Sequence, residues 1–170
     1  MLVLGAHHLD IVVDGLTSDD TVRFLEAHLE EMRAVSPPES KHALDLDGLR
    51  ADGVTFWSAH DAREHGVLVA CGALKVLEPG HGELKSMRVA PSRRGDGLGS
   101  TMLRHLLAEA ATMGLARISL ETGSSAFFAP ARAMYARHGF VECPPFGAYE
   151  ADPNSVFMTR ASRVRHGSRI

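Results

Sequence analysis

Apolar residues recur at helical spacing in two long segments of the chain. Ser18 suits an N-cap, and a first helix follows it up to the break at Pro37-Pro38, with apolar positions at Val22, Leu25, Leu29 and Met32. A second helix ends at the stop residue Gly114 and has its stripe at Leu98, Met102, Leu106, Ala110 and Met113. Shorter helices are predicted over residues 45–50 and 130–138.

Shorter apolar segments between turn-forming residues are typical of strands. We expect strands over residues 10–14, 54–59, 67–76, 82–89, 117–121 and 155–159, and one that starts at Phe140. The second and third of these flank a turn and predict an antiparallel hairpin. The order of strands and helices predicts an α/β (α+β) fold, in which a mixed sheet has helices on both faces.

The strand over residues 82–89 lacks a cleanly apolar side. Successive side chains of an extended chain point to opposite faces, which places Leu84, Ser86 and Arg88 on one side. The other side then carries Glu83, Lys85, Met87 and Val89. Because a plain core strand has at least one apolar side, we expect the edge and one face of this strand to serve a ligand.

The composition indicates a soluble globular protein. The chain has 170 residues, of which 45% are hydrophobic and 23% are charged, with a formal net charge of −3. We expect a single domain over residues 1–160 and a basic, disordered tail over residues 161–170. The net charge gives no general attraction to nucleic acid or to an anionic membrane, so neither is an expected partner.

Cysteine and histidine usage narrows the chemistry further. Cys71 and Cys143 lie in apolar surroundings without metal-ligand spacing, which predicts reduced, buried thiols in a cytoplasmic protein. The 10 histidines are scattered along the chain, and the pair His7-His8 lacks the i, i+4 spacing of a helical zinc motif. No metal is expected, and no segment is long and apolar enough to span a bilayer.

Three glycines at alternate positions follow the strand over residues 82–89, in the segment Arg93-Arg94-Gly95-Asp96-Gly97-Leu98-Gly99-Ser100. Glycine allows close approach to an anion, and the helix that follows offers unpaired N–H groups and the positive end of its dipole. The loop therefore predicts a pyrophosphate site. A Walker loop is excluded because no Lys follows Gly99, and a dinucleotide loop is a weak match because the spacing is G-x-G-x-G.

The segment from Arg94 to Gly99 fits R-x-x-G-x-G and resembles the GNAT superfamily of N-acetyltransferases. Residues 131–140 resemble the family's A-x-x-L-Y-x-x-x-G-F signature, with Met134 in place of Leu and with Tyr135 at the tyrosine position. The resemblance covers approximately residues 54–160. Residues 36–40, 80–87 and 152–158 also resemble a group of small, poorly characterised bacterial GNAT proteins.

The resemblance implies a mostly antiparallel, twisted sheet with a splayed central parallel strand pair, and acetyl-CoA as the co-substrate. Main-chain groups near the end of the strand over residues 82–89 would pair with the pantetheine arm, and the glycine loop would carry the pyrophosphate. Many members have an Asn where this chain has Phe128. The implied cofactor-binding residues are Met87, Arg88, Val89, Arg94, Gly95, Asp96, Gly97, Leu98, Gly99, Ser100, Phe128 and Ala131.

The resemblance also names two candidate catalytic residues. Glu83 stands where several members place a catalytic glutamate and is the candidate base, and its alternative role is a solvated turn residue or an ion-pair partner. Tyr135 is the candidate acid, and its alternative role is a packing aromatic. Proton transfer from a phenol to a thiolate is uphill by about 2 kcal/mol at reference pKa values, which a transient step tolerates. Main-chain N–H groups near Met87 would polarise the acetyl carbonyl.

The acceptor of the acetyl group is expected to be a small-molecule amine. Arg88 would favour an acceptor with a carboxylate, although a surface arginine is an equal alternative. Trp57 fits a core aromatic as well as a site residue, and Glu39 or Ser40 fits a helix cap. The suspected acceptor-site residues are Glu39, Ser40, His42, Trp57, Arg88, Phe127 and Tyr149. Alternative functions are acetylation of a protein or peptide amine, or sensing of acyl-CoA; a homodimer is common in such families.

Overall fold

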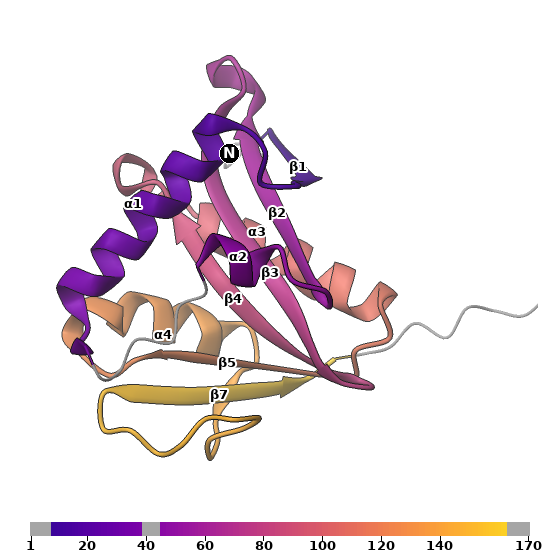
Figure 1. Cartoon of the computed structure of the whole chain (residues 1–170), viewed down its shortest axis with the longest axis vertical. Helices are drawn as coiled ribbons and strands as arrows, with labels where there is room; N and C mark the ends of the chain where they lie inside the picture. The colour runs from indigo at the N-terminus through magenta and orange to yellow at the C-terminus, as the bar shows by residue number, and fades with distance from the viewer. Residues whose placement is uncertain (1–7, 39–44, 163–170) are drawn as a thin grey trace, which may run out of the picture.

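The fold is built on one seven-stranded sheet (Figure 1), seen in a computed structural model that describes residues 8–38 and 45–162. The strands are ordered β1-β2-β3-β4-β5-β7-β6, and only β4 and β5 pair in parallel. Their bounds are β1 Leu9–Val13, β2 Val54–Asp61, β3 Val67–Glu78, β4 His81–Val89, β5 Arg117–Gly123, β6 Val141–Glu142 and β7 Ser155–Ala161. The mixed, mostly antiparallel sheet predicted from the sequence is confirmed.

Helices cover both faces of the sheet (Figure 1), as expected. Their bounds are α1 Asp19–Val35, α2 Leu46–Leu49, α3 Leu98–Thr112 and α4 Ala129–Arg137. Ser18 is the N-cap of α1, since its side chain accepts a hydrogen bond from Thr21 N at 3.2 Å. The last strand runs to Ala161, so it includes the first residue of the predicted tail, whose residues 163–170 lie outside the described residues.

Two apolar cores lie on opposite faces of the sheet. The larger core packs α3 and α4 against the sheet through residues such as Leu106 and Tyr135. The smaller core holds α1 and α2 through Leu25 and Leu49, which pack with buried residues of β2 and β3. Burial of these two helical stripes is what fixes the helices to the sheet.

The parallel pair β4 and β5 is splayed, as the resemblance implied. Pairing runs from His81 with Arg117 to Leu84 with Leu120 and extends no further between these strands. Beyond that point β4 continues to Val89 and β5 to Gly123 without pairing to each other. The strands therefore separate next to the glycine loop.

The pairing of β3 with β4 contains a bulge. Cys71 pairs with Arg88 and Ala73 pairs with Lys85, so β4 has two residues where β3 has one. Ser86 is one of these two residues and has a φ of 54°, in the left-handed region that a non-glycine residue rarely adopts. The left-handed conformation of Ser86 accommodates the additional residue, and β4 continues as one strand on both sides of it.

The bulge makes the predicted alternation along this strand wrong. Directly paired residues share a face of the sheet, so Lys85 and Arg88 both lie on the face that α1 covers. Met87 and Val89 pack against the opposite core, together with Leu84. Strict alternation fails after Lys85 because the inserted residue shifts every later side chain to the other face.

Candidate active site

A cleft of about 1270 Å³ opens where β4 and β5 separate. Its walls come from the C-terminal half of α1, the end of β4, the glycine loop, the end of β5 and the segment at residues 127–137. Cofactor motifs and the candidate acid were predicted in three of these segments: the end of β4, the glycine loop and residues 127–137. The cleft therefore brings together motifs that lie far apart in the sequence.

The glycine loop presents its backbone at one end of the cleft. Gly95 and Gly97 have φ angles of 90° and 81°, where a Cβ atom is strongly disfavoured. Gly97 is the N-cap of α3, and within the described structure no side chain caps this helix. The first-turn amides thus remain available to an anion. The loop fits the pyrophosphate of acetyl-CoA, which Gly95 and residues 97–100 would hold.

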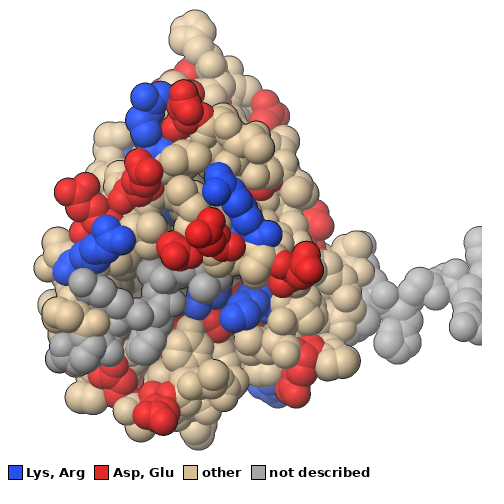
Figure 2. Space-filling model, in the orientation of Figure 1, with Lys and Arg blue, Asp and Glu red and all other residues tan. Residues whose placement is uncertain are grey.

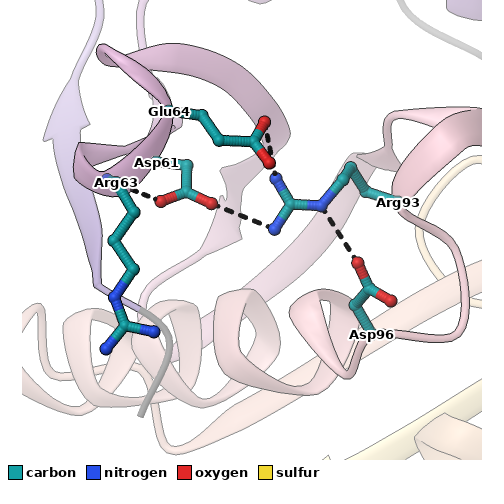
Figure 3. Close-up of polar contacts among 5 residues, drawn as sticks. All are labelled: Asp61, Arg63, Glu64, Arg93 and Asp96. Carbon is teal, nitrogen blue, oxygen red and sulfur yellow. Dashed lines mark hydrogen bonds and ion pairs between the residues drawn. The ribbon is translucent and has the colours of Figure 1, made fainter. Parts of the chain in front are cut away.

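Arg93 ties the glycine loop to the turn between β2 and β3 (Figure 3). Its guanidinium donates to Asp61 Oδ2 and to Asp96 Oδ2, both at 3.0 Å, and lies 3.4 Å from Glu64 Oε2. The Arg63 backbone N–H also donates to Asp61, and this bond together with Arg93 lowers the pKa of Asp61. Asp96 was predicted to bind cofactor, but Arg93 engages its side chain and Asp96 does not line the cleft.

Arg94 connects the same loop to α1. Arg94 Nη2 donates a hydrogen bond to Glu31 Oε1, and its guanidinium lies over the ring of Phe127, 5.9 Å from the centroid. Arg94 and Phe127 both line the cleft and are partly exposed. A guanidinium in this position can exchange a carboxylate for a phosphate oxygen, because both are anionic acceptors.

The bulge of β4 packs against α3 opposite a glycine. A Cβ atom at Gly72 would lie 2.6 Å from Leu106 Cδ1 and 2.8 Å from Met87 Sδ, so only glycine fits here without a shift. A bulge leaves one residue of the strand outside the regular ladder. Backbone donors at Ser86 and Met87 are therefore suitable for polarising a carbonyl that enters the splay.

Tyr135 lines the cleft from α4. It is buried, and its ring packs edge-on against Phe140 with centroids 5.7 Å apart. Burial, with a smaller effect from the charge of Glu121, raises the pKa of Tyr135, so the phenol keeps its proton at working pH. A Cβ atom at Gly99 would lie 3.0 Å from Met134 Sδ, which shows how closely α4 approaches the start of α3.

Phe128 takes the place of the asparagine that many family members have. Its ring covers Gly123 at the end of β5, where a Cβ atom would lie 2.1 Å from Phe128 Cδ2. Arg132 Nη1 donates to the backbone carbonyls of Gly123 and Ser125 at 2.6 and 2.9 Å. Phe128 and Ala131 line the cleft. The wall is therefore apolar at the position where many family members have a polar asparagine.

Glu83 belongs to a buried hydrogen-bonded triad. Its Oε1 accepts from Lys85 Nζ and from the Tyr149 hydroxyl, each at 2.8 Å, and Lys85 Nζ also donates to the Tyr149 oxygen at 2.8 Å. Lys85 and Tyr149 line the cleft, whereas Glu83 is 2% exposed and does not. Any proton that reaches Glu83 from the cleft must therefore pass through these two residues or a water molecule.

Arg88 extends from β4 toward α1. Its side chain is 5% exposed, and its guanidinium lies over the ring of Phe24, 5.2 Å from the centroid. Arg88 Nη1 lies 3.6 Å from Glu31 Oε1, beyond hydrogen-bonding distance. The neighbouring His28 lines the same wall, where burial and the charge of Arg88 lower its pKa to about 4. His28 is thus neutral near pH 7.

The remaining predicted acceptor residues are placed differently. Trp57 packs edge-on against His105 in the core beneath α3, with ring centroids 6.2 Å apart, and does not line the cleft. The remaining three, Glu39, Ser40 and His42, lie outside the described residues. Of the predicted cofactor residues, those that line the cleft are Met87, Arg88, Val89, Arg94, Gly95, Gly97, Leu98, Gly99, Ser100, Phe128 and Ala131.

Sequence reasoning did not assign roles to His28, Glu31 and Lys85, although all three line the cleft. His28 and Glu31 do carry a signal, because they lie three residues apart and beside the apolar stripe of α1. Lys85 carries no such signal, because its position on the face that α1 covers follows from its pairing with Ala73 of β3.

Features outside the cleft bear on the predictions for surface charge, membrane-spanning segments, metal sites and thiols. Charges of both signs are interspersed on the face that carries α1 (Figure 2). Within residues 8–38 and 45–162, no helix is long and apolar enough to cross a membrane, and no cluster of metal-ligating side chains occurs. Both cysteines are free: Cys71 is buried, and burial raises its pKa to about 12, whereas Cys143 is partly exposed, contrary to the prediction.

A splayed parallel pair beside a glycine loop, with a tyrosine on the facing helix, defines an acyl-CoA N-acyltransferase. The chain matches the Acetyltransferase (GNAT) family over residues 21–140 and belongs to that family, so it is an N-acetyltransferase. It is 48% identical over 152 residues to the "Uncharacterized N-acetyltransferase YsnE" of Bacillus subtilis (strain 168), covering 89% of this chain and 99% of that protein.

Two further comparisons agree with this assignment. The "Uncharacterized N-acetyltransferase YedL" of Escherichia coli (strain K12) is 44% identical over 149 residues, covering 88% of this chain and 92% of that protein. A crystal structure of a candidate acyl-CoA N-acyltransferase from Klebsiella pneumoniae is 28% identical, with a TM-score of 0.70, and the match covers 92% of this chain and 99% of that one. The predicted family is confirmed.

Proposed function

We propose that this enzyme transfers the acetyl group of acetyl-CoA directly to the primary amine of a small molecule. The observation that carries the proposal is the continuity of the cleft, whose wall includes the glycine loop, the bulge of β4, Tyr135 and the Lys85–Tyr149 pair. Direct transfer needs phosphate, thioester and amine to share one chamber, because the amine must reach the carbonyl while the pyrophosphate is held.

Acetyl-CoA supplies an activated acetyl thioester when bound. The first-turn amides of α3 hold its pyrophosphate, and backbone N–H groups near Met87 polarise the carbonyl. Tyr135 acts as the acid that protonates the departing sulfur. The buried setting that raises the pKa of Tyr135 also disfavours a thiolate, so the two pKa values move in the same direction.

Glu83 acts as the base through Tyr149. An alkyl amine has a pKa near 10.4 and must lose a proton before it attacks. The Tyr149 hydroxyl lines the cleft and donates to Glu83 Oε1, so it can pass a proton to the carboxylate while it accepts one from the amine. Lys85 keeps the carboxylate and the hydroxyl in place.

Thiol release from acetyl-CoA with a panel of small amines tests the proposal. We expect thiol production that depends on the amine, and Tyr135→Phe should lower turnover by roughly 10²- to 10⁴-fold. Calorimetry should find the acetyl-CoA affinity of that variant nearly unchanged. Tight cofactor binding without amine-dependent thiol release would favour an acyl-CoA sensor, and activity on peptides alone would favour a protein acetyltransferase.

A further inference from the structure

The cleft wall formed by β4 and α1 contains hydrogen-bond donors without acceptors. In the described part of the chain, Arg88 Nε and Nη1 are buried and have no hydrogen-bond partner, and neither has Ser86 Oγ, two residues away on β4. Buried guanidinium groups are almost always hydrogen-bonded, because an unmade bond to a charged donor is costly. Both residues line the cleft.

Charges on this wall are also out of balance. Glu31 faces two guanidinium groups, but its Oε1 accepts its hydrogen bond from Arg94, and Arg88 Nη1 lies 3.6 Å away. Two other titratable groups of α1 line the cleft: His28, which is neutral near pH 7, and Arg33, which adds a further positive charge. Lys85 is already paired with Glu83. Among the described residues, the Arg88 guanidinium therefore has no carboxylate within hydrogen-bonding distance.

We propose that Arg88 and Ser86 form a subsite for the carboxylate of the acceptor, so that the acetylated molecule is an amine that also carries a carboxylate. The inference rests on the proposed function and deepens it. A carboxylate matches a guanidinium through two parallel N–H···O bonds, and it offers a further lone pair to a hydroxyl.

The position of the subsite suits this role. Arg88 lies on the α1 face of β4, and the adjacent Met87 packs toward the core beneath α3. An acceptor held by Arg88 therefore approaches the bulge from the face opposite that core. Lys85 and Tyr149 lie on this same wall of the cleft, so the amine of such an acceptor faces the relay to Glu83. A polyamine would instead add positive charge beside Arg88.

The experiment compares amino acids with their carboxamides, using thiol release from acetyl-CoA. For the wild type we expect kcat/KM to be 10- to 100-fold higher for the carboxylate form of the preferred amino acid. In Arg88→Gln this preference should fall to about threefold or less. Ser86→Ala should lower the preference by roughly threefold to tenfold, and Arg88→Lys should restore part of it.

Glu31→Gln provides a matched variant with the opposite expectation. Removing this carboxylate makes the electrostatic potential around Arg88 more positive. KM for the amino acid should therefore fall, while KM for the carboxamide stays constant. Equal kcat/KM for the two forms in the wild type would overturn the inference while leaving acetyl transfer intact. A loss of acetyl-CoA affinity in Arg88→Gln, without a change in carboxylate preference, would assign Arg88 to the cofactor and also overturn it.

A binding measurement separates this inference from the proposed function. N-acetyl amino acids and their amides are titrated by calorimetry into the enzyme with CoA present. Tighter binding of the carboxylate form that is lost in Arg88→Gln supports the subsite even where no amine is acetylated. Equal binding of both forms overturns it, whatever the thiol assay shows.

Discussion

The Tyr149 hydroxyl donates a hydrogen bond to Glu83 Oε1 at 2.8 Å, which connects a residue of the cleft wall to a carboxylate that is almost completely buried. Lys85 closes the arrangement by donating to both oxygens. The carboxylate therefore communicates with the cleft through a side chain that can both accept and donate a proton.

Tyr149→Phe removes this connection and leaves the Glu83–Lys85 ion pair in place. We expect kcat/KM for the amine to fall about 100-fold, because the carboxylate no longer receives a proton through the hydroxyl. The ring contacts with Phe146 and Phe157 are kept, but two hydrogen bonds to buried charged groups are lost, so the free energy of unfolding should fall by about 1–3 kcal/mol. Steady-state kinetics and urea unfolding measure the two effects, and unaltered kinetics would contradict the relay.

Glu83→Gln is a less direct test of the same relay. It leaves the Lys85 ammonium buried without its carboxylate, and breaking a buried pair in this way is commonly destabilising by about 3–5 kcal/mol. The double variant Glu83→Gln with Lys85→Met removes that charge and is the better comparison. Activity of the double variant that equals the wild type would exclude Glu83 as the base.

Gly72→Ala tests the packing that supports the bulge. The new Cβ atom would lie 2.6 Å from Leu106 Cδ1 and 2.8 Å from Met87 Sδ, so one of these side chains must move. We expect a loss of about 1–3 kcal/mol in the free energy of unfolding, together with lower turnover as Met87 shifts. Gly15→Ala is the matched control, since its nearest atom would be Thr17 Cγ2 at 3.8 Å. Equal stability of the two variants would argue against this role.

The bulge also shows where the sequence was insufficient. The glycine loop and the helix after it were predictable, because glycine conformation and an apolar stripe are local properties of residues 95–113. The placement of Arg88 on the same face as Lys85 was not, because it depends on a register shift between β3 and β4. Neither Gly72 nor Ser86 signals by itself that β4 has an extra residue.

The acceptor wall was only partly predictable for a similar reason. Arg88 and Tyr149 were suspected from the resemblance, and both line the cleft. Trp57 was suspected too, but its register with Gly72 directs it to the core beneath α3. The ion pairs of Glu31 with Arg88 and Arg94 could not be predicted from the sequence, because they form only when α1 packs across β4.

Arg93→Gln tests whether the glycine loop is held ready for its ligand. Arg93 bonds to Asp61 and Asp96 and thereby joins the loop to the turn between β2 and β3 (Figure 3). Without these bonds the loop must be ordered on binding, so KM for acetyl-CoA should rise roughly threefold to tenfold with kcat nearly constant. Arg63→Gln is the control, because Arg63 bonds to Asp61 through its backbone N–H. A similar KM in both variants would contradict the argument.

The buried His28 should make stability depend on pH. Its pKa is lowered from 6.5 to about 4, chiefly by burial and then by the charge of Arg88, with Arg94 acting in the same direction and Glu31 in the opposite one. Between pH 4 and 6.5 the unfolded chain binds a proton that the folded protein does not. Stability from this group is therefore complete above pH 6.5 and is lost as the pH falls toward 4.

His28→Leu removes this contribution. For the wild type, His28 should lower the free energy of unfolding by about 2 kcal/mol between pH 7 and pH 5. The variant should lose that part of the slope and keep the smaller part that comes from His138, whose pKa is also lowered by burial. Asp61 does not interfere, because a lowered carboxylate pKa acts only below its usual value of 3.8. Urea titrations at the two pH values measure the difference, and parallel slopes in both proteins would show that His28 is not a neutral group in this wall.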